Sequence, residues 1–204
     1  MKILLATGNR HKVAELIAIL NNDRGTAGFD FVSLADFPDL PEVVEDGQTL
    51  EDNAVKKAVT GALATGLWAL ADDTGLEVPA LNGAPGVYSA RYAGPNCDFQ
   101  DNCNKLLSEL EGKKGSERDA AFRCVVALST PAGIVRISSG KLEGRITESA
   151  AGGEGFGYDP IFLVTELGKT LAEISADEKN AISHRWAAVR GVRPWLEEIA
   201  SGVQ

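Results

Sequence analysis

Residues 2–22 read KILLATGNRHKVAELIAILNN, and this stretch decides the fold class. Its first six residues are a short apolar run, which predicts a buried strand over residues 2–7. After the turn that follows, every third or fourth residue is apolar, which predicts an amphipathic helix over residues 10–22. A strand that turns directly into such a helix is typical of sheet proteins of the α/β or mixed α+β class.

Apolar and amphipathic segments alternate along the rest of the chain, so we expect a mixed sheet flanked by helices. The further strands are predicted over residues 29–34, 67–71, 120–130, 133–147 and 161–164. The further helices are predicted over residues 50–65, 98–111 and from Ser175 onward, where T-L-E-D and S-A-D-E resemble capping boxes. The strand over 67–71 is expected to end at Asp72 and Asp73, and residues 74–97 to form an ordered loop with a short helical turn. We expect one domain over 1–204, with a second lobe over about 74–150.

The composition excludes several classes of protein. Lys and Arg number 20 against 29 Asp and Glu, a formal net charge of −9, which argues against nonspecific binding of nucleic acid or of an anionic membrane. No apolar run reaches the roughly 18 residues of a membrane span, and the first residues are predicted to be a strand and not a signal peptide. Three cysteines without a CxxC motif and only two histidines argue against a zinc site or a disulfide framework, so a reducing cytoplasm is the expected location.

The turn Thr7-Gly8-Asn9-Arg10-His11-Lys12 lies between the first strand and the first helix. A helix N-terminus presents backbone N–H groups and a positive dipole end, both of which favour phosphate. Gly8 allows close approach of a ligand, and Lys12 adds a positive charge one turn inside the helix. The glycine spacing is not that of a Walker A loop. The simpler interpretation, a helix with an ordinary N-cap, remains open.

Acidic and amide side chains are candidates for a metal site. Asp72 and Asp73 follow an apolar strand, and ligand sites in α/β sheets lie at the carboxyl ends of strands. Because strand neighbours point to opposite faces, at most one of the two is expected to face a site. Carboxylates of this kind suit Mg²⁺, although an Asx-turn before Gly75 is the alternative. Asn53 and Lys57 share one helix face, which is either part of the site or a solvated surface.

Two later segments could bind an aromatic ligand. Between glycines 155 and 157, Phe156 offers a flat face for stacking on a nucleobase, and Asp159 offers an acceptor, although core aromatics in a turn are the alternative. The segment EKNAISHR places Lys179, His184 and Arg185 within seven residues. On one continuous helix the first two would lie about 140° apart, so we expect a helix break near Ser183.

The order of these motifs closely resembles the inosine triphosphate pyrophosphatase family. The resemblance runs from Lys2 to about Leu196 through TGNRHK, EDNAVKK, ADDTGLEV, GFGYDPIF and EKNAISHR. It implies hydrolysis of ITP, dITP and XTP to the nucleoside monophosphate and pyrophosphate, with Mg²⁺ as cofactor. It also implies an elongated mixed sheet, two lobes with a cleft between them, and a homodimer.

The resemblance also implies roles for individual residues. Asp73 matches the catalytic aspartate, and a carboxylate of the preceding acidic loop, Glu45 in preference to Glu42, matches the metal ligand. The matching substrate contacts are Thr7, Gly8, Asn9, Arg10, His11, Lys12, Thr74, Phe156, Gly157, Tyr158, Asp159, Lys179, His184 and Arg185. Thr74 stands where many members have Ser, and the hydroxyl is retained.

The chemistry of the residues agrees with these roles. Lys12, Lys57 and the first helix N-terminus can hold phosphates, with Asn53 beside them. Asp73 can act as base, as metal ligand or as both, and His184 or Arg185 can donate to a 6-keto oxygen. A pyrophosphatase for other modified nucleotides and a non-catalytic nucleotide-binding module are the alternatives, and the choice between Mg²⁺ and Mn²⁺ stays open.

Overall fold

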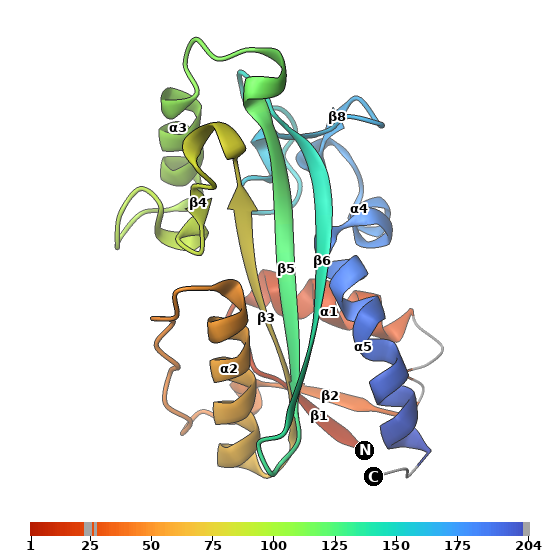
Figure 1. Cartoon of the computed structure of the whole chain (residues 1–204). Helices are drawn as coiled ribbons and strands as arrows, with labels where there is room; N and C mark the ends of the chain where they lie inside the picture. The colour runs from red at the N-terminus through yellow and green to blue at the C-terminus, as the bar shows by residue number, and fades with distance from the viewer. Residues whose placement is uncertain (23–25, 27, 202–204) are drawn as a thin grey trace. The chain divides into compact units, whose positions relative to one another are not determined.

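The computed structural model describes residues 1–22, 26 and 28–201. Its helices are α1 (Arg10–Asn21), α2 (Leu50–Thr65), α3 (Phe99–Glu109), α4 (Ala176–Ile182) and α5 (His184–Ala200). Its strands are β1 (Lys2–Leu5), β2 (Asp30–Ser33), β3 (Trp68–Glu77), β4 (Pro85–Gly86), β5 (Asp119–Ser129), β6 (Val135–Ile146), β7 (Phe162–Val164) and β8 (Lys169–Thr170). In the described part of the chain these eight strands form one sheet, in the order β2-β1-β3-β5-β6-β7-β8 with β4 on β3 (Figure 1).

The sheet is mixed, which confirms the predicted fold class. Strand β1 pairs in parallel with both β2 and β3. Strand β4 pairs antiparallel with β3, and β7 pairs antiparallel with β6 and with β8. The apolar residues Ile3, Leu4 and Leu5 of β1 have no exposed surface. A strand that is covered on both faces is apolar at successive positions, which explains the unbroken run that the sequence shows there.

The chain divides into two compact units. Unit 1 comprises Met1–Asp73, Cys124–Gly140 and His184–Gln204, and unit 2 comprises Thr74–Arg123 and Lys141–Ser183. Strands β3, β5 and β6 contribute residues to both units. This division differs from the expected second lobe over 74–150. The difference arises because Val126 and Leu128 in the middle of that range belong to the core of unit 1, whereas Phe162 beyond it belongs to the core of unit 2.

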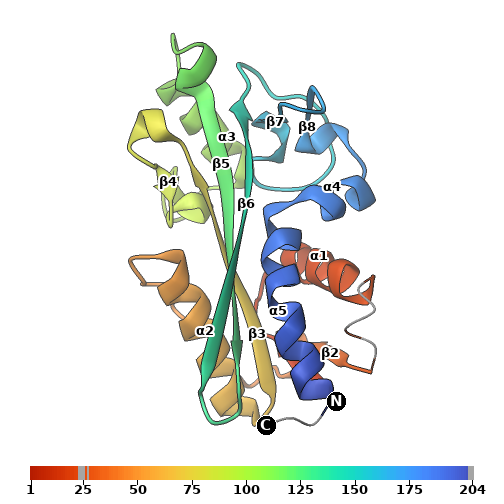
Figure 2. The ribbon, with the colours of Figure 1, turned by 45° about the vertical axis from the view of Figure 1, so that its right-hand side comes forward.

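Unit 1 has helices on both faces of its strands. Ile3 and Leu5 of β1 share an apolar core with residues of α1 and α5. The alternate residue, Leu4, faces α2, where a Cβ atom added to Gly61 would lie 2.9 Å from its Cδ2 atom. Figure 2 shows α2 on one side of these strands and α1 with α5 on the other. The small residue at position 61 therefore permits close packing of α2 on the sheet.

Unit 2 has a separate apolar core. Its members come from β3, α3, β5, β6 and β7 and include Leu76, Leu106, Phe122, Ile146 and Phe162. The rings of Phe122 and Phe162 lie 4.7 Å apart between centroids, at an interplanar angle of 45°. This tilted geometry is among those that aromatic pairs favour.

The predicted helix boundaries are confirmed where capping residues decide them. The Thr49 hydroxyl accepts from the Asp52 amide at 3.1 Å, and the Asp52 carboxylate accepts from the Thr49 amide at 3.0 Å, so α2 begins at Leu50. Ser175 forms the second capping box with Glu178. The expected break is also present, since α4 ends at Ile182 and α5 begins at His184 after Ser183, whose ψ of 156° is extended.

One predicted boundary is wrong. Strand β3 does not end at the acidic pair but continues to Glu77, so part of the expected loop over 74–97 is strand. The continuation is stabilised because Leu76 is buried in the core of unit 2 and pairs with Gly86 of β4. Two charged residues can occupy the interior of a strand only where partners neutralise them, and the sequence pattern alone does not show those partners.

Candidate functional site

The turn between β1 and α1 is a capped helix start in unit 1. The Asn9 side-chain oxygen accepts from the amides of His11 at 3.0 Å and Lys12 at 3.2 Å. Thr7 is buried, with 5 % of its surface exposed, and a Cβ atom added to Gly8 would meet no atom within 4 Å. The predicted N-cap geometry is therefore present. The open space at Gly8 leaves room for a ligand beside the helix N-terminus.

Asp72, the first member of the acidic pair, forms a buried ion-pair cluster. One of its carboxylate oxygens, Oδ2, accepts from Arg185 Nε at 3.3 Å and Nη2 at 3.1 Å, and lies 3.3 Å from Lys12 Nζ. The remaining guanidinium nitrogen of Arg185 donates to Glu15. Burial alone would raise the pKa of Asp72, but the neighbouring lysine and arginine charges outweigh it and hold that pKa well below its usual value. Asp72 is therefore an ionised carboxylate.

Asp73, the second member, has a different environment on the opposite side of β3. Its Oδ1 atom lies 3.3 Å from Lys57 Nζ and 4.0 Å from Lys12 Nζ, and its Oδ2 atom accepts from Asn53 Nδ2 at 3.2 Å. Burial raises the pKa of Asp73, and its cationic neighbours offset that effect only in part, so the pKa lies above the usual value. A carboxylate with a raised pKa is better suited than its neighbour to accept a proton.

Glu45 joins Asp73 through a shared cation. Lys57 Nζ lies 2.7 Å from Glu45 Oε1 and 3.3 Å from Asp73 Oδ1. Burial lowers the pKa of Lys57, but the surrounding carboxylates more than compensate and raise it above its ordinary value. The lysine therefore stays charged between two carboxylates that belong to different parts of unit 1.

Asp73 and Glu45 are the candidate carboxylates for Mg²⁺. In the part of the chain that the structure describes, no group of three or more His, Cys, Asp or Glu side chains could hold a metal ion. Mg²⁺ is commonly bound by one or two carboxylates together with substrate phosphates, and Asp73 and Glu45 supply two carboxylates around one positive charge. Glu42, the other candidate, lines a small cavity of about 110 Å³ together with Glu45. The preference for Glu45 stays a prediction.

In unit 2, Asp159 organises the loop that contains Phe156. Asp159 is 2 % exposed, and its Oδ2 atom accepts from the Phe156 amide at 2.8 Å and from Lys179 Nζ at 2.5 Å. Gly155 has a φ of +76°, and a Cβ atom there would lie 2.1 Å from the same oxygen. Asp159 therefore accepts hydrogen bonds from its own loop and from Lys179. The sequence instead predicted that it would accept a hydrogen bond from a nucleobase.

The two aromatic residues of the GFGYD motif have different surroundings. The Phe156 ring is half-buried and has Lys179 Nζ at 4.7 Å from its centroid. Tyr158 is 4 % exposed, belongs to the core of unit 2, and donates its hydroxyl to the Ser89 carbonyl at 2.9 Å. The interpretation as a core aromatic therefore holds for Tyr158, and Phe156 is the residue suited to stacking.

The remaining predicted residues differ in exposure. Arg10 and His11 are exposed, and Thr74 and Gly157 are partly buried. His184 and Arg185 lie in the first turn of α5 with 3 % and 1 % of their surfaces exposed. Arg185 was expected to donate to a base, but the structure shows its guanidinium against Asp72 and Glu15, because a buried charge requires carboxylate partners.

Two residues of this arrangement were missed by sequence reasoning. Glu15 is the acidic residue of α1, and its role becomes visible only through its contact with Arg185 in the folded chain. Gly47 donates its amide to Asn53 Oδ1 at 2.8 Å, and a Cβ atom there would lie 2.6 Å from that oxygen. The sequence signal that could have identified Gly47 is its position two residues before the capping box at Thr49. Its bond fixes Asn53, whose amide in turn reaches Asp73.

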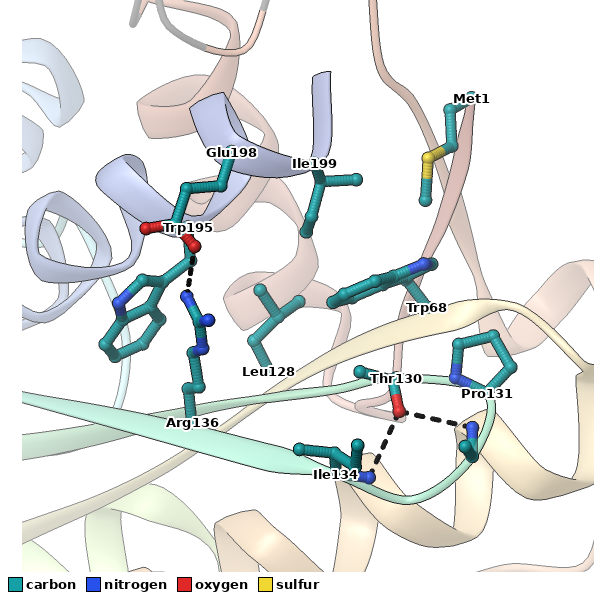
Figure 3. A pocket seen from close by; sticks show the side chains of 11 residues that line it. Met1, Trp68, Leu128, Thr130, Pro131, Ile134, Arg136, Trp195, Glu198 and Ile199 are labelled. Atoms are coloured by element: carbon teal, nitrogen blue, oxygen red, sulfur yellow. Dashed lines mark hydrogen bonds and ion pairs between the residues drawn. The ribbon is translucent and has the colours of Figure 1, made fainter. Parts of the chain in front are cut away.

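A larger cavity in unit 1 contains none of the predicted site residues. Its volume is about 560 Å³, and Trp68, Leu128 and Trp195 are among the residues that line it (Figure 3). At its edge Arg136 pairs with Glu198 and lies over the Trp195 ring, 5.8 Å from the centroid. This cavity is mainly apolar, so cavity volume alone does not identify the site around Asp72 and Asp73.

Fold and residues together define the class of protein. It is a mixed α/β protein in which two buried carboxylates of unit 1 pair with lysines and an arginine, and a half-buried aromatic ring of unit 2 lies beside a buried lysine. The model of the Ham1 family matches residues 3–195. The chain belongs to the Ham1 family.

Curated relatives and solved structures agree with this assignment. A dITP/XTP pyrophosphatase of Geobacter sulfurreducens is 53 % identical over 188 residues, which are 92 % of either chain. The structure of a HAM1 protein from Coxiella burnetii has a TM-score of 0.85 at 42 % identity and covers 97 % of this chain and 99 % of its own. A dITP/XTP pyrophosphatase structure from Mycobacterium abscessus has a TM-score of 0.76 at 44 % identity and covers 96 % of this chain and 100 % of its own.

Proposed function

We propose that this protein hydrolyses the non-canonical purine nucleotides ITP, dITP and XTP to the nucleoside monophosphate and pyrophosphate. The family assignment and the names of the relatives support this activity. The observation that carries the proposal is Asp73, a buried carboxylate with a raised pKa that is held by Asn53 and Lys57.

The residues of unit 1 account for the phosphate chemistry. Lys12, Lys57 and the N-terminus of α1 supply positive charge for phosphate oxygens. Both lysines are already paired with carboxylates, so a triphosphate requires further positive charge. Mg²⁺ held by Asp73 and Glu45 would supply it and neutralise phosphate oxygens.

Asp73 is the proposed acceptor of the proton from the attacking water. Burial raises its pKa, which makes it a better proton acceptor than an ordinary aspartate, and its Oδ1 atom lies near the two lysines that would hold the phosphates. Asn53 fixes the carboxylate through its Oδ2 atom, so the group is oriented before substrate binds. Whether Asp73 serves as base, as metal ligand or as both is part of the proposal to be tested.

The residues of unit 2 account for selection of the base. Phe156 offers a face for stacking, which tolerates any purine. Lys179 is an ammonium with three N–H donors, so it suits the 6-keto oxygen of hypoxanthine or xanthine. Adenine carries an exocyclic amine at that position, so the amine and the Lys179 ammonium, both hydrogen-bond donors, would face each other. A mismatch of this kind in a buried site discriminates strongly because it leaves polar groups unpaired.

The decisive experiment measures pyrophosphate release across a nucleotide panel, with and without Mg²⁺. We expect kcat/KM for ITP, dITP and XTP to exceed that for ATP, dUTP and a methylated guanine nucleotide by about 10²-fold or more. We also expect turnover to disappear when EDTA removes the metal and to return on addition of Mg²⁺, with Mn²⁺ tested beside it. Preference for dUTP or for the methylated nucleotide would favour the related enzyme class. Binding of nucleotide without any release would identify a non-catalytic module.

The remaining expectations concern assembly and location. We infer a homodimer from the family resemblance, and light scattering at micromolar concentration would measure the mass directly. Among the described residues, no helix is long and apolar enough to cross a bilayer. The acidic balance of 29 carboxylates against 20 basic residues favours a small phosphorylated substrate over nucleic acid or a membrane as partner. Cytoplasmic location remains a prediction.

A further inference from the structure

Helix α3 presents one face to the loop that contains Phe156. Phe99 and Cys103 are four residues apart and therefore lie on the same side of α3. The Phe99 ring lies 6.0 Å from the Phe156 ring between centroids, at an interplanar angle of 45°. Cys103 Sγ donates to the Gly157 carbonyl at 3.4 Å. Two successive turns of the helix thus contact two successive residues of the loop.

The helix itself is firmly held within unit 2. Asn102 is 2 % exposed, accepts from the Ala93 amide at 2.8 Å and donates to the Ala90 carbonyl at 3.3 Å. Leu106 and Leu110 are fully buried in the apolar core. Because α3 is fixed by these contacts, a side chain on it can fix a neighbouring loop.

Phe99 is the more exposed of the two residues that contact the loop. It is 43 % exposed, whereas Cys103 one turn later is 3 % exposed. Phe99 therefore lies at the surface of unit 2, and the contact that the structure shows for its ring is with Phe156. Its tilted contact with Phe156 is a geometry that stabilises aromatic pairs beyond the apolar area they bury.

We propose that Phe99 is a positioning residue that fixes the orientation of the Phe156 ring for stacking on the nucleobase. The contacts of the Phe156 ring include Lys179 Nζ at 4.7 Å and the Phe99 ring at 6.0 Å. The Phe156 amide is held separately by Asp159. Loss of Phe99 leaves the loop backbone in place but frees the ring to rotate. This inference rests on the proposed function, because it assigns the stacking role to Phe156.

The test compares Phe99→Ala, Phe99→Tyr and Gln100→Ala in the full chain. Gln100 is the next residue on α3, is exposed, and donates to Asn104 one turn along the same helix, so its variant is the matched control. We expect Phe99→Ala to raise KM for ITP about three- to tenfold with kcat within about twofold, because stacking stabilises ground state and transition state alike. Phe99→Tyr retains the ring and should restore the wild-type KM.

A second measurement separates this inference from the proposed function. In ¹³C-phenylalanine-labelled protein, the Phe156 ring signals, identified by their loss in Phe156→Leu, should shift in Phe99→Ala and stay in place in Gln100→Ala and Phe99→Tyr. If the wild-type protein released no pyrophosphate from ITP, the proposed function would fail while the ring signals still decided the role of Phe99. Unchanged ring signals and unchanged KM in Phe99→Ala, or equal losses in the Ala and Tyr variants, would overturn the inference.

Discussion

At the scale of residues, the two neighbouring carboxylates of β3 have been made chemically different by their surroundings. Asp72 lies against Arg185 and Lys12 and has a lowered pKa. Asp73 lies against Lys57 and Asn53 and has a raised pKa. Divergent pKa values of adjacent groups are a usual sign of divided roles. This difference supports the proposal that Asp72 balances charge in the fold and that Asp73 accepts the proton.

Asp73→Asn should nearly abolish turnover and leave the protein folded. The amide is isosteric, but it cannot accept a proton from water and is a poor ligand for Mg²⁺. We expect kcat to fall about 10²-fold or more, with a circular dichroism spectrum and Tm like those of the wild type. Full activity in the folded variant would remove Asp73 from the mechanism.

Arg185→Ala should first of all destabilise the protein. It removes a partner of the buried Asp72 carboxylate and of the partly buried Glu15, and breaking a buried ion pair costs about 3–5 kcal/mol. Urea unfolding measures this loss. The control is Arg193→Ala on the same helix, whose exposed pair with Glu197 should contribute less than about 1 kcal/mol.

The Arg185→Ala variant also tests selectivity between ITP and ATP. If Arg185 also donates to the 6-keto group, kcat/KM of the folded fraction should fall more for ITP than for ATP. Equal loss for both nucleotides would limit Arg185 to its carboxylate partners.

At the scale of elements, the loop before the short turn at Asp159–Ile161 depends on backbone conformation as much as on side chains. Gly155 adopts a φ that L side chains rarely adopt, and this brings its backbone against the Asp159 carboxylate. Asp159 then binds the Phe156 amide and Lys179. One acidic side chain therefore sets both the loop conformation and the position of the lysine.

Gly155→Ala should disturb this loop far more than Gly153→Ala. The first substitution adds a methyl group 2.1 Å from Asp159 Oδ2 at a φ of +76°, whereas the second meets no atom within 4 Å. We expect a loss of about 2 kcal/mol or more, a fall in Tm of about 4–8 °C, together with a raised KM for ITP. Calorimetry and steady-state kinetics on both variants give the comparison, and similar Tm values for the two would contradict it.

At the scale of the whole molecule, stability comes from two apolar cores, one in each unit. The core of unit 2 contains a titratable member, Cys103 on α3. Burial raises the pKa of this thiol to about 11 from its ordinary value of 9.0, and the nearby Asp159 carboxylate contributes. The folded state therefore favours the neutral thiol.

The free energy of unfolding should consequently fall in the alkaline range. Below pH 9 the thiol is protonated in both the folded and the unfolded state, so its contribution is constant. Between about pH 9 and 11 the unfolded thiol ionises first, which favours the unfolded state. Urea unfolding at pH 8 and pH 10.5 should show a smaller loss for Cys103→Ala than for the wild type. Identical losses would show that other groups cause the alkaline effect.

The sequence by itself determined the class of the sheet, the cap at Thr49, the break at Ser183 and membership of a family with known motifs. These features depend on neighbours within a few positions, such as hydrophobic periodicity and an N-cap with its partner at the third residue. The candidate residues of the site were found in the same way, because each motif is short and contiguous. These local patterns did not predict that Lys57 pairs with both Glu45 and Asp73.

Only the tertiary structure decided which partner each charged group meets. Asp72 and Arg185 are 113 residues apart, and no local pattern links them. The energy of a buried charge depends on burial and on partners within a few ångströms, and these follow from how distant strands and helices pack. For the same reason β3 continues through the acidic pair, Asp159 turns to its own loop, and Tyr158 is a core residue while Phe156 is not.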